Sequence, residues 1–595
     1  MEWYRQVQFV SAVPMPPEMA DEFGTTVNGM WASPEPSSAE AVGELHRKGR
    51  RVLFSVPLIA LTPRVYEEPG NEYLLREVCR DVAGRTSECG WYYWERKPVY
   101  AACIYSDAFR RYLLDRCKRG VDLGMDVVNL DEIMTSVGLM NRDARGTGFC
   151  PRCLERFRSH LRQGGDAELA SADDDVLLDR LWRDDDLYGR YRRFHQREAF
   201  RVTSAFIAEL RAHADATNPA FAISANVAYL GNFVETFGTL WGCLWGPHLD
   251  FVLMENDYRV THDDPHLILP RGKFTAWYRL GSAFTGAPVW ICPSINVPRQ
   301  LAGEDRRRYY ELMFLEAYAN GGRWGYYWWP GVDPDTRRQA TAPDVLKDHI
   351  RFIGGHRDLF EETMSMNDLA IVYLDGPILR RPETHMKYVA LAQALAESGY
   401  QFDVVFVGDG EFNPDDLDPA ALQSYRAVLV PEAQDLGAAP TAALEAYARA
   451  GGDLVVFSEG PMAHDAGRRE DGAMLLDFWR GYRDEDRDRI AATVSGFDGS
   501  RIESSDPTVN AVRYAWGDRQ VVHLLDYGYD PETDTIRSAT DVRISVPWSG
   551  GAATCRLLAP EGETELAGRV EGERLVVDVP RIDPYAVLVI GKVAG

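Results

Sequence analysis

The chain has 595 residues, of which 26% are charged, and its formal net charge is −25 at pH 7. This excess of negative charge repels phosphate backbones and anionic lipid surfaces, which argues against nucleic acid and membrane partners. No apolar run reaches the roughly 18 residues of a membrane-spanning helix, no basic flank precedes an apolar run at the N-terminus, and nine cysteines do not form the pattern of a secreted disulfide framework. We therefore expect a cytoplasmic protein of several domains with a small neutral ligand.

The first part of the chain alternates β-branched or aromatic runs with amphipathic segments, which is typical of βα units around a parallel sheet. Eight strands are expected there, at residues 7–13, 25–31, 51–58, 125–132, 221–227, 249–256, 288–296 and 323–330. Helical patterns lie between most of them, for example at 37–49, 106–124 and 191–214. Eight such units predict a (β/α)8 TIM barrel over residues 1–345, with an active site at the carboxyl ends of the strands.

Two further domains are expected after the barrel. Strands predicted at 368–377, 401–410, 425–434 and 451–460 alternate with helices, which indicates a small doubly wound α/β domain over residues 346–495. The pattern then changes to short strands separated by turns, and we expect a C-terminal β-sandwich over residues 496–595.

Two adjacent carboxylates, Asp131 and Glu132, stand where the fourth strand ends. Because side chains alternate along a strand, Asp131 shares a face with Asn129, and a polar Asn129 fits a wet barrel mouth better than a helix-packed face. Glu255 ends the sixth strand at the same rim. Two carboxylates that flank a glycosidic bond suffice for glycoside hydrolysis, so we predict Asp131 as nucleophile and Glu255 as acid/base, with Glu132 as a substitute in either role. The structural alternative is that these acids cap helices or pair with cations.

Other side chains near strand ends complete the picture of a carbohydrate cleft, because aromatic rings stack on the apolar C–H faces of sugars. Some of these aromatics must instead belong to the core. The candidates for substrate binding are Trp31, Trp94, Asn226, Asp257, Arg259, Trp277, Asn296 and Trp328.

The order of barrel, small α/β domain and β domain resembles the family 42 β-galactosidases, whose middle domain is a trimerisation domain. A local resemblance lies in "CIYSDAFRRYL" at 103–113 and "GFCPRCLERFRSHL" at 148–161. It implies a structural zinc on Cys103, Cys150 and Cys153, although the family's further cysteine just before the last pair is absent. Because tetrahedral zinc takes four ligands, either another residue completes the site or these residues are buried thiols.

The catalytic positions depart from that family. Glu132 matches its fourth-strand acid/base by position, but Asp131 replaces the preceding Asn, and the seventh strand, "VWICPSIN" at 289–296, holds no carboxylate for the nucleophile. A fourth-strand Asp with a sixth-strand acid is the arrangement of α-galactosidase-type barrels, so β-galactosidase activity is not assumed.

The middle domain also resembles class I glutamine amidotransferases, which need a nucleophilic cysteine. No cysteine occurs between Cys292 and Cys555. The resemblance therefore implies a role in oligomerisation, as a homotrimer or another homo-oligomer.

We predict a glycoside hydrolase that cleaves small glycosides or oligosaccharides, exo-acting and retaining, with no cofactor required for catalysis. A transglycosylase on the same carboxylates is one alternative. An inactive carbohydrate-binding or scaffolding protein is another, favoured by the missing seventh-strand acid. The sequence leaves open the sugar, its anomeric configuration and its linkage.

Overall fold

The computed structural model describes most of the chain. The described residues are 2–30, 38–89, 97–228, 248–256, 272, 275–293, 307–328, 343–375, 383–410, 413–431, 436–457 and 490–592, apart from positions 12–14, 16, 132, 134, 139, 141–145, 498, 500, 531 and 532. Within these ranges no helix has both the length and the hydropathy needed to cross a bilayer. The chain divides into two compact units, one formed by Met30–Ala228 with Leu244–Val252 and the other by Met1–Gly29, Tyr229–Cys243 and Leu253–Gly595.

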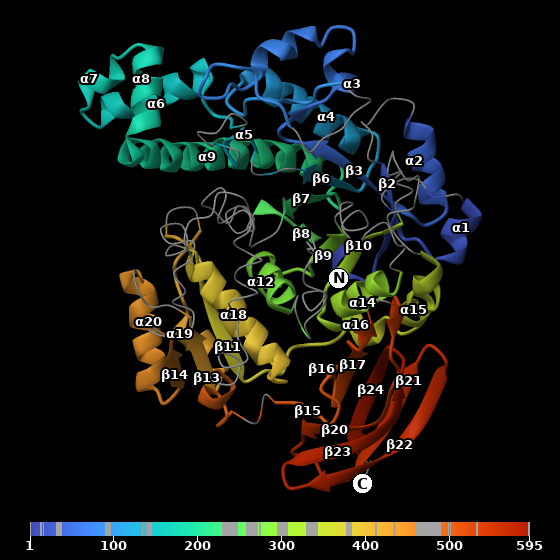
Figure 1. Ribbon diagram of the computed structural model, residues 1–595. Coiled ribbons are helices and arrows are strands. Elements are labelled where there is room, and N and C mark those ends of the chain that lie inside the picture. The colour runs from blue at the N-terminus through green and yellow to red at the C-terminus, as the bar shows by residue number, and fades with distance from the viewer. Residues whose placement is uncertain are drawn as a thin grey trace. The chain divides into compact units, whose positions relative to one another are not determined.

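Eight parallel strands close into a barrel in the order β1-β10-β9-β8-β7-β6-β3-β2 (Figure 1). Their bounds are β1 Phe9–Ser11, β2 Val27–Met30, β3 Arg51–Pro57, β6 Val127–Asp131, β7 Ala222–Ala228, β8 Phe251–Asn256, β9 Trp290–Pro293 and β10 Arg323–Trp328. Each of them falls inside the run where the sequence predicted a strand, except that β7 continues one residue further. The predicted TIM barrel is therefore confirmed.

Helices connect these strands. They are α1 Pro17–Glu22, α2 Ser38–Arg47, α4 Asp107–Asp122, α9 Asp185–Thr217, α12 Thr275–Thr285, α14 Arg307–Ala319 and α15 Pro343–Gly355. Helix α4 begins where Ser106 accepts a 3.0 Å hydrogen bond from the backbone N–H of Phe109, which satisfies an amide that the helix leaves unpaired.

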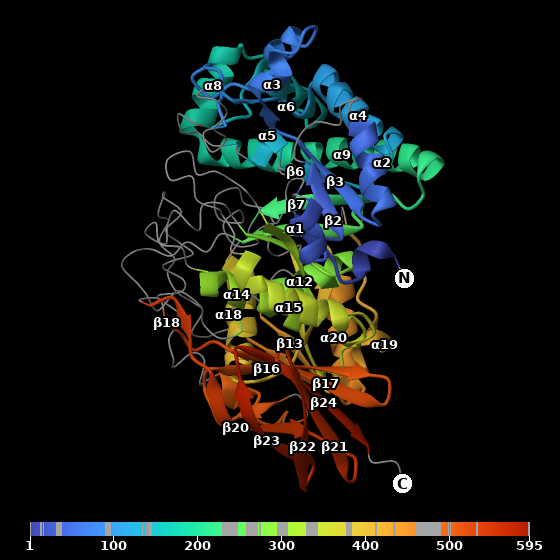
Figure 2. The same cartoon turned by 90° about the vertical axis from the view of Figure 1, so that its right-hand side faces the viewer.

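Two connections carry extra structure. Between β3 and α4 lie β4 Ala60–Leu61, α3 Pro63–Tyr66, the 3-10 helix η2 Glu72–Glu77 and β5 Tyr100–Ala101. Between β6 and β7 lie α5 Thr135–Gly138, α6 Pro151–Gln163, α7 Ala167–Ala170 and α8 Asp174–Arg183, followed by the long α9. Figures 1 and 2 both show α6 and α8 beside α9.

The middle domain is a four-stranded parallel sheet in the order β12-β11-β13-β14. Its strands are β11 Leu369–Leu374, β12 Asp403–Val407, β13 Ala427–Val430 and β14 Asp453–Val456, each inside a run predicted as a strand, and its helices are α16 Asp358–Glu361, α18 Glu383–Glu397, α19 Pro419–Leu422 and α20 Ala438–Arg449. Neighbours out of sequence order, joined in parallel, are typical of a doubly wound sheet.

The C-terminal domain is antiparallel, as the sequence predicted. Its eight-stranded sheet runs β15-β20-β23-β22-β21-β24-β17-β16, beside the two-stranded β18-β19. The bounds are β15 Glu503–Ser504, β16 Val509–Trp516, β17 Arg519–Asp526, β18 Tyr529–Asp530, β19 Thr535–Ile536, β20 Ala539–Pro547, β21 Ala553–Ala559, β22 Gly562–Glu571, β23 Arg574–Ile582 and β24 Tyr585–Lys592.

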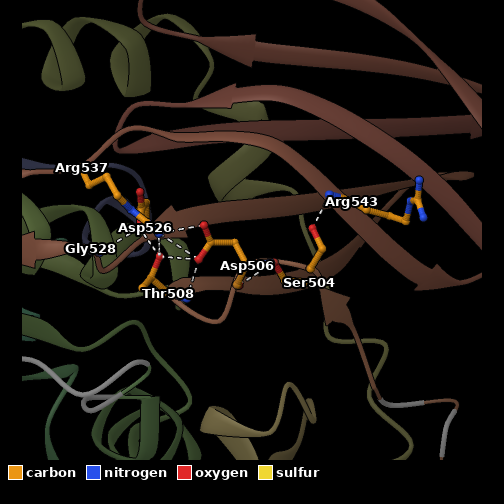
Figure 3. Close-up of polar contacts among 8 residues, drawn as sticks. Ser504, Asp506, Thr508, Asp526, Gly528, Arg537 and Arg543 are labelled. Atoms are coloured by element: carbon orange, nitrogen blue, oxygen red, sulfur yellow. Dashed lines mark hydrogen bonds and ion pairs between the residues drawn. The ribbon is translucent and has the colours of Figure 1, made fainter.

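Strand β22 joins two layers of this domain. It pairs with β21 through residues 562–567 and with β23 through residues 568–571, so one continuous sheet folds over a shared apolar core (Figure 2). A cluster of polar side chains stabilises the turn before β16 (Figure 3). Asp506 accepts hydrogen bonds from Thr508 and Arg537, and Thr508 Oγ1 lies 2.7 Å from Asp526.

Candidate active site and metal centre

The contacts of β3 and β6 show which of their side chains point into the barrel. A β-carbon at Gly120 of α4 would lie 2.2 Å from the ring of Phe54, so Phe54 points outward into the helix layer. Ser55, its neighbour on β3, points to the opposite side, and it lies in register with Asn129 of β6. Asn129 donates a 3.2 Å hydrogen bond to Ser55, so polar side chains occupy the interior of this part of the barrel.

Asp131 lies on the same face as Asn129, two residues closer to the carboxyl end of β6. The residue is 5% exposed, and Asn226 of β7 donates a 3.0 Å hydrogen bond from Nδ2 to its Oδ1. An amide donor stabilises the ionised form of a carboxylate and fixes its orientation. The structure thus brings together two of the predicted site residues, at the strand end and on the face that alternation predicted.

Glu255 and Trp328 lie near the carboxyl ends of β8 and β10, which is where the sequence placed them, and their side chains are outside the described residues. Glu255 is in register with Cys292 of β9, the strand on which the sequence shows no carboxylate. The other predictions that fall outside the described residues are Glu132, Trp31, Trp94, Asp257, Arg259 and Asn296.

Trp277 lies inside helix α12 and is 7% exposed. Its ring centroid is 5.6 Å from that of His385 on α18 in the middle domain. This packing makes Trp277 part of the protein core, which is one of the two roles that the sequence left open for the aromatics.

The three cysteines singled out by sequence, Cys103, Cys150 and Cys153, lie together, and Cys79 joins them. All four side chains are at most 1% exposed. Cys79 follows η2, Cys103 follows β5, and the other two open helix α6, where Cys150 is the N-cap residue. Sequence reasoning missed Cys79, because Cys79 and Cys89 both precede Cys103 and nothing in their spacing distinguishes them.

The sulfur spacing fits a tetrahedral metal ion. The Sγ atom of Cys150 lies 3.6 Å from that of Cys103 and 3.5 Å from that of Cys153, and the last two are 3.9 Å apart. Four sulfurs at about 2.3 Å from a zinc ion would be about 3.8 Å from one another. A disulfide would need about 2.05 Å, and the seven described cysteine side chains form none.

The chemistry of the cluster also suits a metal, because zinc binds thiolates. Hydrogen bonding with Cys103 and Cys153 holds the pKa of the Cys150 thiol well below its ordinary value. The same network, with Cys103 as its main contributor, raises the pKa of Cys79 and of Cys153. Within this buried cluster the thiolate form is therefore most favoured at Cys150.

No family model matches the sequence, and no curated protein matches it. Solved structures match its fold over almost the whole chain. The α-L-fucosidase isoenzyme 2 from Paenibacillus thiaminolyticus has a TM-score of 0.64 at 12% identity, covering 99% of this chain and 100% of that one. Gan42B, a GH42 β-galactosidase from G. stearothermophilus, has a TM-score of 0.59 at 13% identity, covering 99% and 98%.

A third solved structure, the cold-adapted β-galactosidase from Rahnella sp. R3, has a TM-score of 0.56 at 13% identity and covers 98% of both chains. At such identities the similarity shows a shared fold, a TIM barrel followed by smaller domains, which is found in several glycoside hydrolases. It does not assign this chain to family 42.

Proposed function

We propose that this chain is a glycoside hydrolase acting on small glycosides or oligosaccharides, with Asp131 as its nucleophile. The observation that carries the proposal is the position of Asp131, inside the barrel at the end of β6 with Asn226 bonded to its carboxylate. Active sites of such barrels lie at this end of the strands. The solved structures of similar fold, named as fucosidase and β-galactosidases, support the same reaction class.

Hydrolysis with retention would use two acids in two steps. The Asp131 carboxylate attacks the anomeric carbon while a protonated acid gives its proton to the leaving oxygen, which forms a glycosyl ester. The second acid, now ionised, takes a proton from a water molecule as the water oxygen attacks the anomeric carbon, and the bond from that carbon to Asp131 breaks to release the free carboxylate. We assign the second role to Glu255 at the end of β8, with Glu132 as the substitute in either role.

The test is hydrolysis of a panel of α- and β-aryl glycosides by the wild type and by Asp131→Asn, Glu255→Gln and Glu132→Gln. The panel includes the α-L-fucoside and the β-D-galactoside. We expect turnover of at least one substrate and a loss of about a thousandfold or more in the Asp131 variant and in one Glu variant. Azide should restore turnover to the Asp131 variant, with inverted product, if Asp131 is the nucleophile.

Two other functions would show in the same assay. Transfer of the sugar to an added alcohol, in preference to water, would identify a transglycosylase. Binding of a sugar without turnover would identify a carbohydrate-binding protein, an alternative favoured by the lack of a carboxylate on β9. Full activity in Asp131→Asn would refute the proposed nucleophile.

We also propose a structural zinc ion held by Cys79, Cys103, Cys150 and Cys153. Four thiolates leave no open position for substrate or water, so the ion would serve folding and not catalysis. It would join three segments that are distant in sequence, the end of η2, the end of β5 and the start of α6.

A further inference from the structure

A cavity of about 350 Å³ lies between helices α6 and α9, which Figure 1 shows side by side. Both helices belong to the same compact unit. The volume lies at the lower end of the range for small-molecule sites, roughly 300 to 1,000 Å³. Nothing in the proposed glycosidase mechanism uses this cavity.

Four arginines of α9 line it, Arg190, Arg193, Arg197 and Arg201. Their spacing of three or four residues places them along one side of the helix. The one acid in the lining, Glu198, is already paired, since Arg201 lies 2.8 Å from it and Arg156 lies 3.2 Å from it on its other side. The cavity is therefore strongly basic in a chain whose net charge is −25.

Like charges three or four residues apart on a helix repel. The ion pairs of Arg201 with Glu198 and of Arg190 with Asp166, 3.8 Å long, offset part of this charge. Arg193 has no ion-pair or hydrogen-bond partner within the described ranges, and its side chain is exposed. An anion in the cavity would remove the repulsion.

His160 and Phe194 form the aromatic part of the lining. The ring of His160 on α6 stacks on that of Phe194 on α9, with centroids 4.6 Å apart and planes 23° from parallel. The ring centroid of Phe157, a buried residue of α6, lies 5.7 Å from that of Phe194. These ring contacts join α6 to α9, the helix that carries the arginines. The carboxyl end of α6 disfavours anions, so the arginines must supply the attraction.

We propose that this cavity binds a phosphate ester of a small molecule. Planar guanidinium groups form paired hydrogen bonds with phosphate oxygens, which explains several arginines converging on one place. The organic part of the ligand would rest against the Phe194–His160 pair. The proposal stands on this cavity alone and holds whether or not the chain hydrolyses glycosides.

The test is isothermal titration calorimetry on the full chain at low salt. The probes are inorganic phosphate, glucose 6-phosphate and AMP, with glucose and citrate as comparators that lack a phosphate. We expect at least one ester to bind more tightly than inorganic phosphate and citrate, and glucose to show no binding. The better of the two esters distinguishes a sugar phosphate from a nucleotide.

Two double variants locate the site. Arg193→Gln with Arg197→Gln removes two charges from the cavity, and we expect at least tenfold weaker binding. Arg183→Gln with Arg192→Gln removes the same charge outside the lining, from the end of α8 and from α9, and should bind as the wild type does. Circular dichroism and thermal melting confirm that both variants fold.

Three results would overturn the proposal. They are no binding of either ester at 10 mM probe, citrate binding as tightly as the better ester, and equal loss of binding in both double variants. The last two would indicate general attraction of anions.

Discussion

At the scale of single residues, the surroundings of Asp131 fit the role that we propose for it. Strand alternation alone points Asp131 the same way as Asn129, and the outward contact of Phe54 shows that this direction is the barrel interior. The hydrogen bond from Asn226 then fixes one carboxylate oxygen. In the mechanism that we propose, Asn226 is therefore a positioning residue for Asp131.

Asn226→Ala should lower kcat about 10- to 100-fold, because a hydrogen bond to a charged group contributes roughly 1.5–3 kcal/mol. Ser224→Ala, one layer deeper on the same strand, should leave kcat close to that of the wild type. Steady-state kinetics on the best aryl glycoside measures both. An Asn226→Ala enzyme with wild-type kcat would show that Asp131 needs no such support.

Gly120 of α4 tests the packing that orients β3. A methyl group at this position would meet the Phe54 ring at 2.2 Å, so Gly120→Ala should destabilise the fold by about 1–3 kcal/mol. At Gly43 of α2 the nearest atom would be 3.7 Å away, and Gly43→Ala should instead stabilise it by about 0.5–1 kcal/mol. Urea unfolding measures the change in unfolding free energy for both variants. A change of the same sign in both would refute the packing argument.

At the scale of elements, the cysteine cluster brings two short elements next to a longer helix. The 3-10 helix η2 has six residues and β5 has two, and in each case one residue separates the end of the element from a clustered cysteine. The zinc ion that we propose would tie these short elements to α6.

Cys79→Ala should abolish stoichiometric zinc, which we expect at about one ion per chain in the wild type, and should lower the thermal midpoint. Cys117→Ala is the matched control. Cys117 lies in α4 outside the cluster, and burial raises the pKa of its thiol to about 12. The Cys117→Ala variant should therefore bind as much zinc as the wild type. Elemental analysis after dialysis measures the metal. Wild-type zinc in Cys79→Ala would exclude a four-cysteine site.

At the scale of the whole molecule, a buried histidine makes the free energy of unfolding depend on pH. His523 in the C-terminal sheet is 1% exposed, lies 2.6 Å from the hydroxyl of Tyr585, and burial lowers its pKa to about 3. The folded chain therefore keeps this ring neutral while the unfolded chain protonates it near pH 6.5. Its contribution to stability is present above that pH and is lost as the pH falls towards 3.

Between pH 7.5 and 5.0 the wild type should lose about 2 kcal/mol of unfolding free energy through His523. His523→Gln should lack this loss, so the stability difference between variant and wild type should shrink by the same amount at pH 5.0. Urea unfolding at both pH values measures it.

The assembly state is the other whole-molecule prediction. The middle domain resembles a trimerisation domain and has no catalytic cysteine, so we propose a homotrimer or another homo-oligomer. Sedimentation equilibrium should give a mass of about three times the 67.0 kDa of one chain. A species of one chain at micromolar concentration would refute this role of the domain.

The sequence by itself determined the repeated elements of this protein. The barrel and middle-domain strands appear where β-branched and aromatic runs predicted them, because burial on both faces demands such runs in any parallel sheet. The position of Asp131 followed in the same way, from the period of two along β6. These are local properties, which the order of residues fixes directly.

Only the tertiary structure decided which distant residues meet. Cys79 completes the sulfur cluster because the segment after η2 pairs with β5, the strand that precedes Cys103. The N–H of Cys79 donates a 2.7 Å hydrogen bond to the carbonyl of Ala101. Trp277 turned inward because α12 packs on the middle domain, and the arginines of α9 gathered into a cavity because α6 lies beside them. Contacts of this kind depend on how elements pack in space, and no spacing along the chain encodes them.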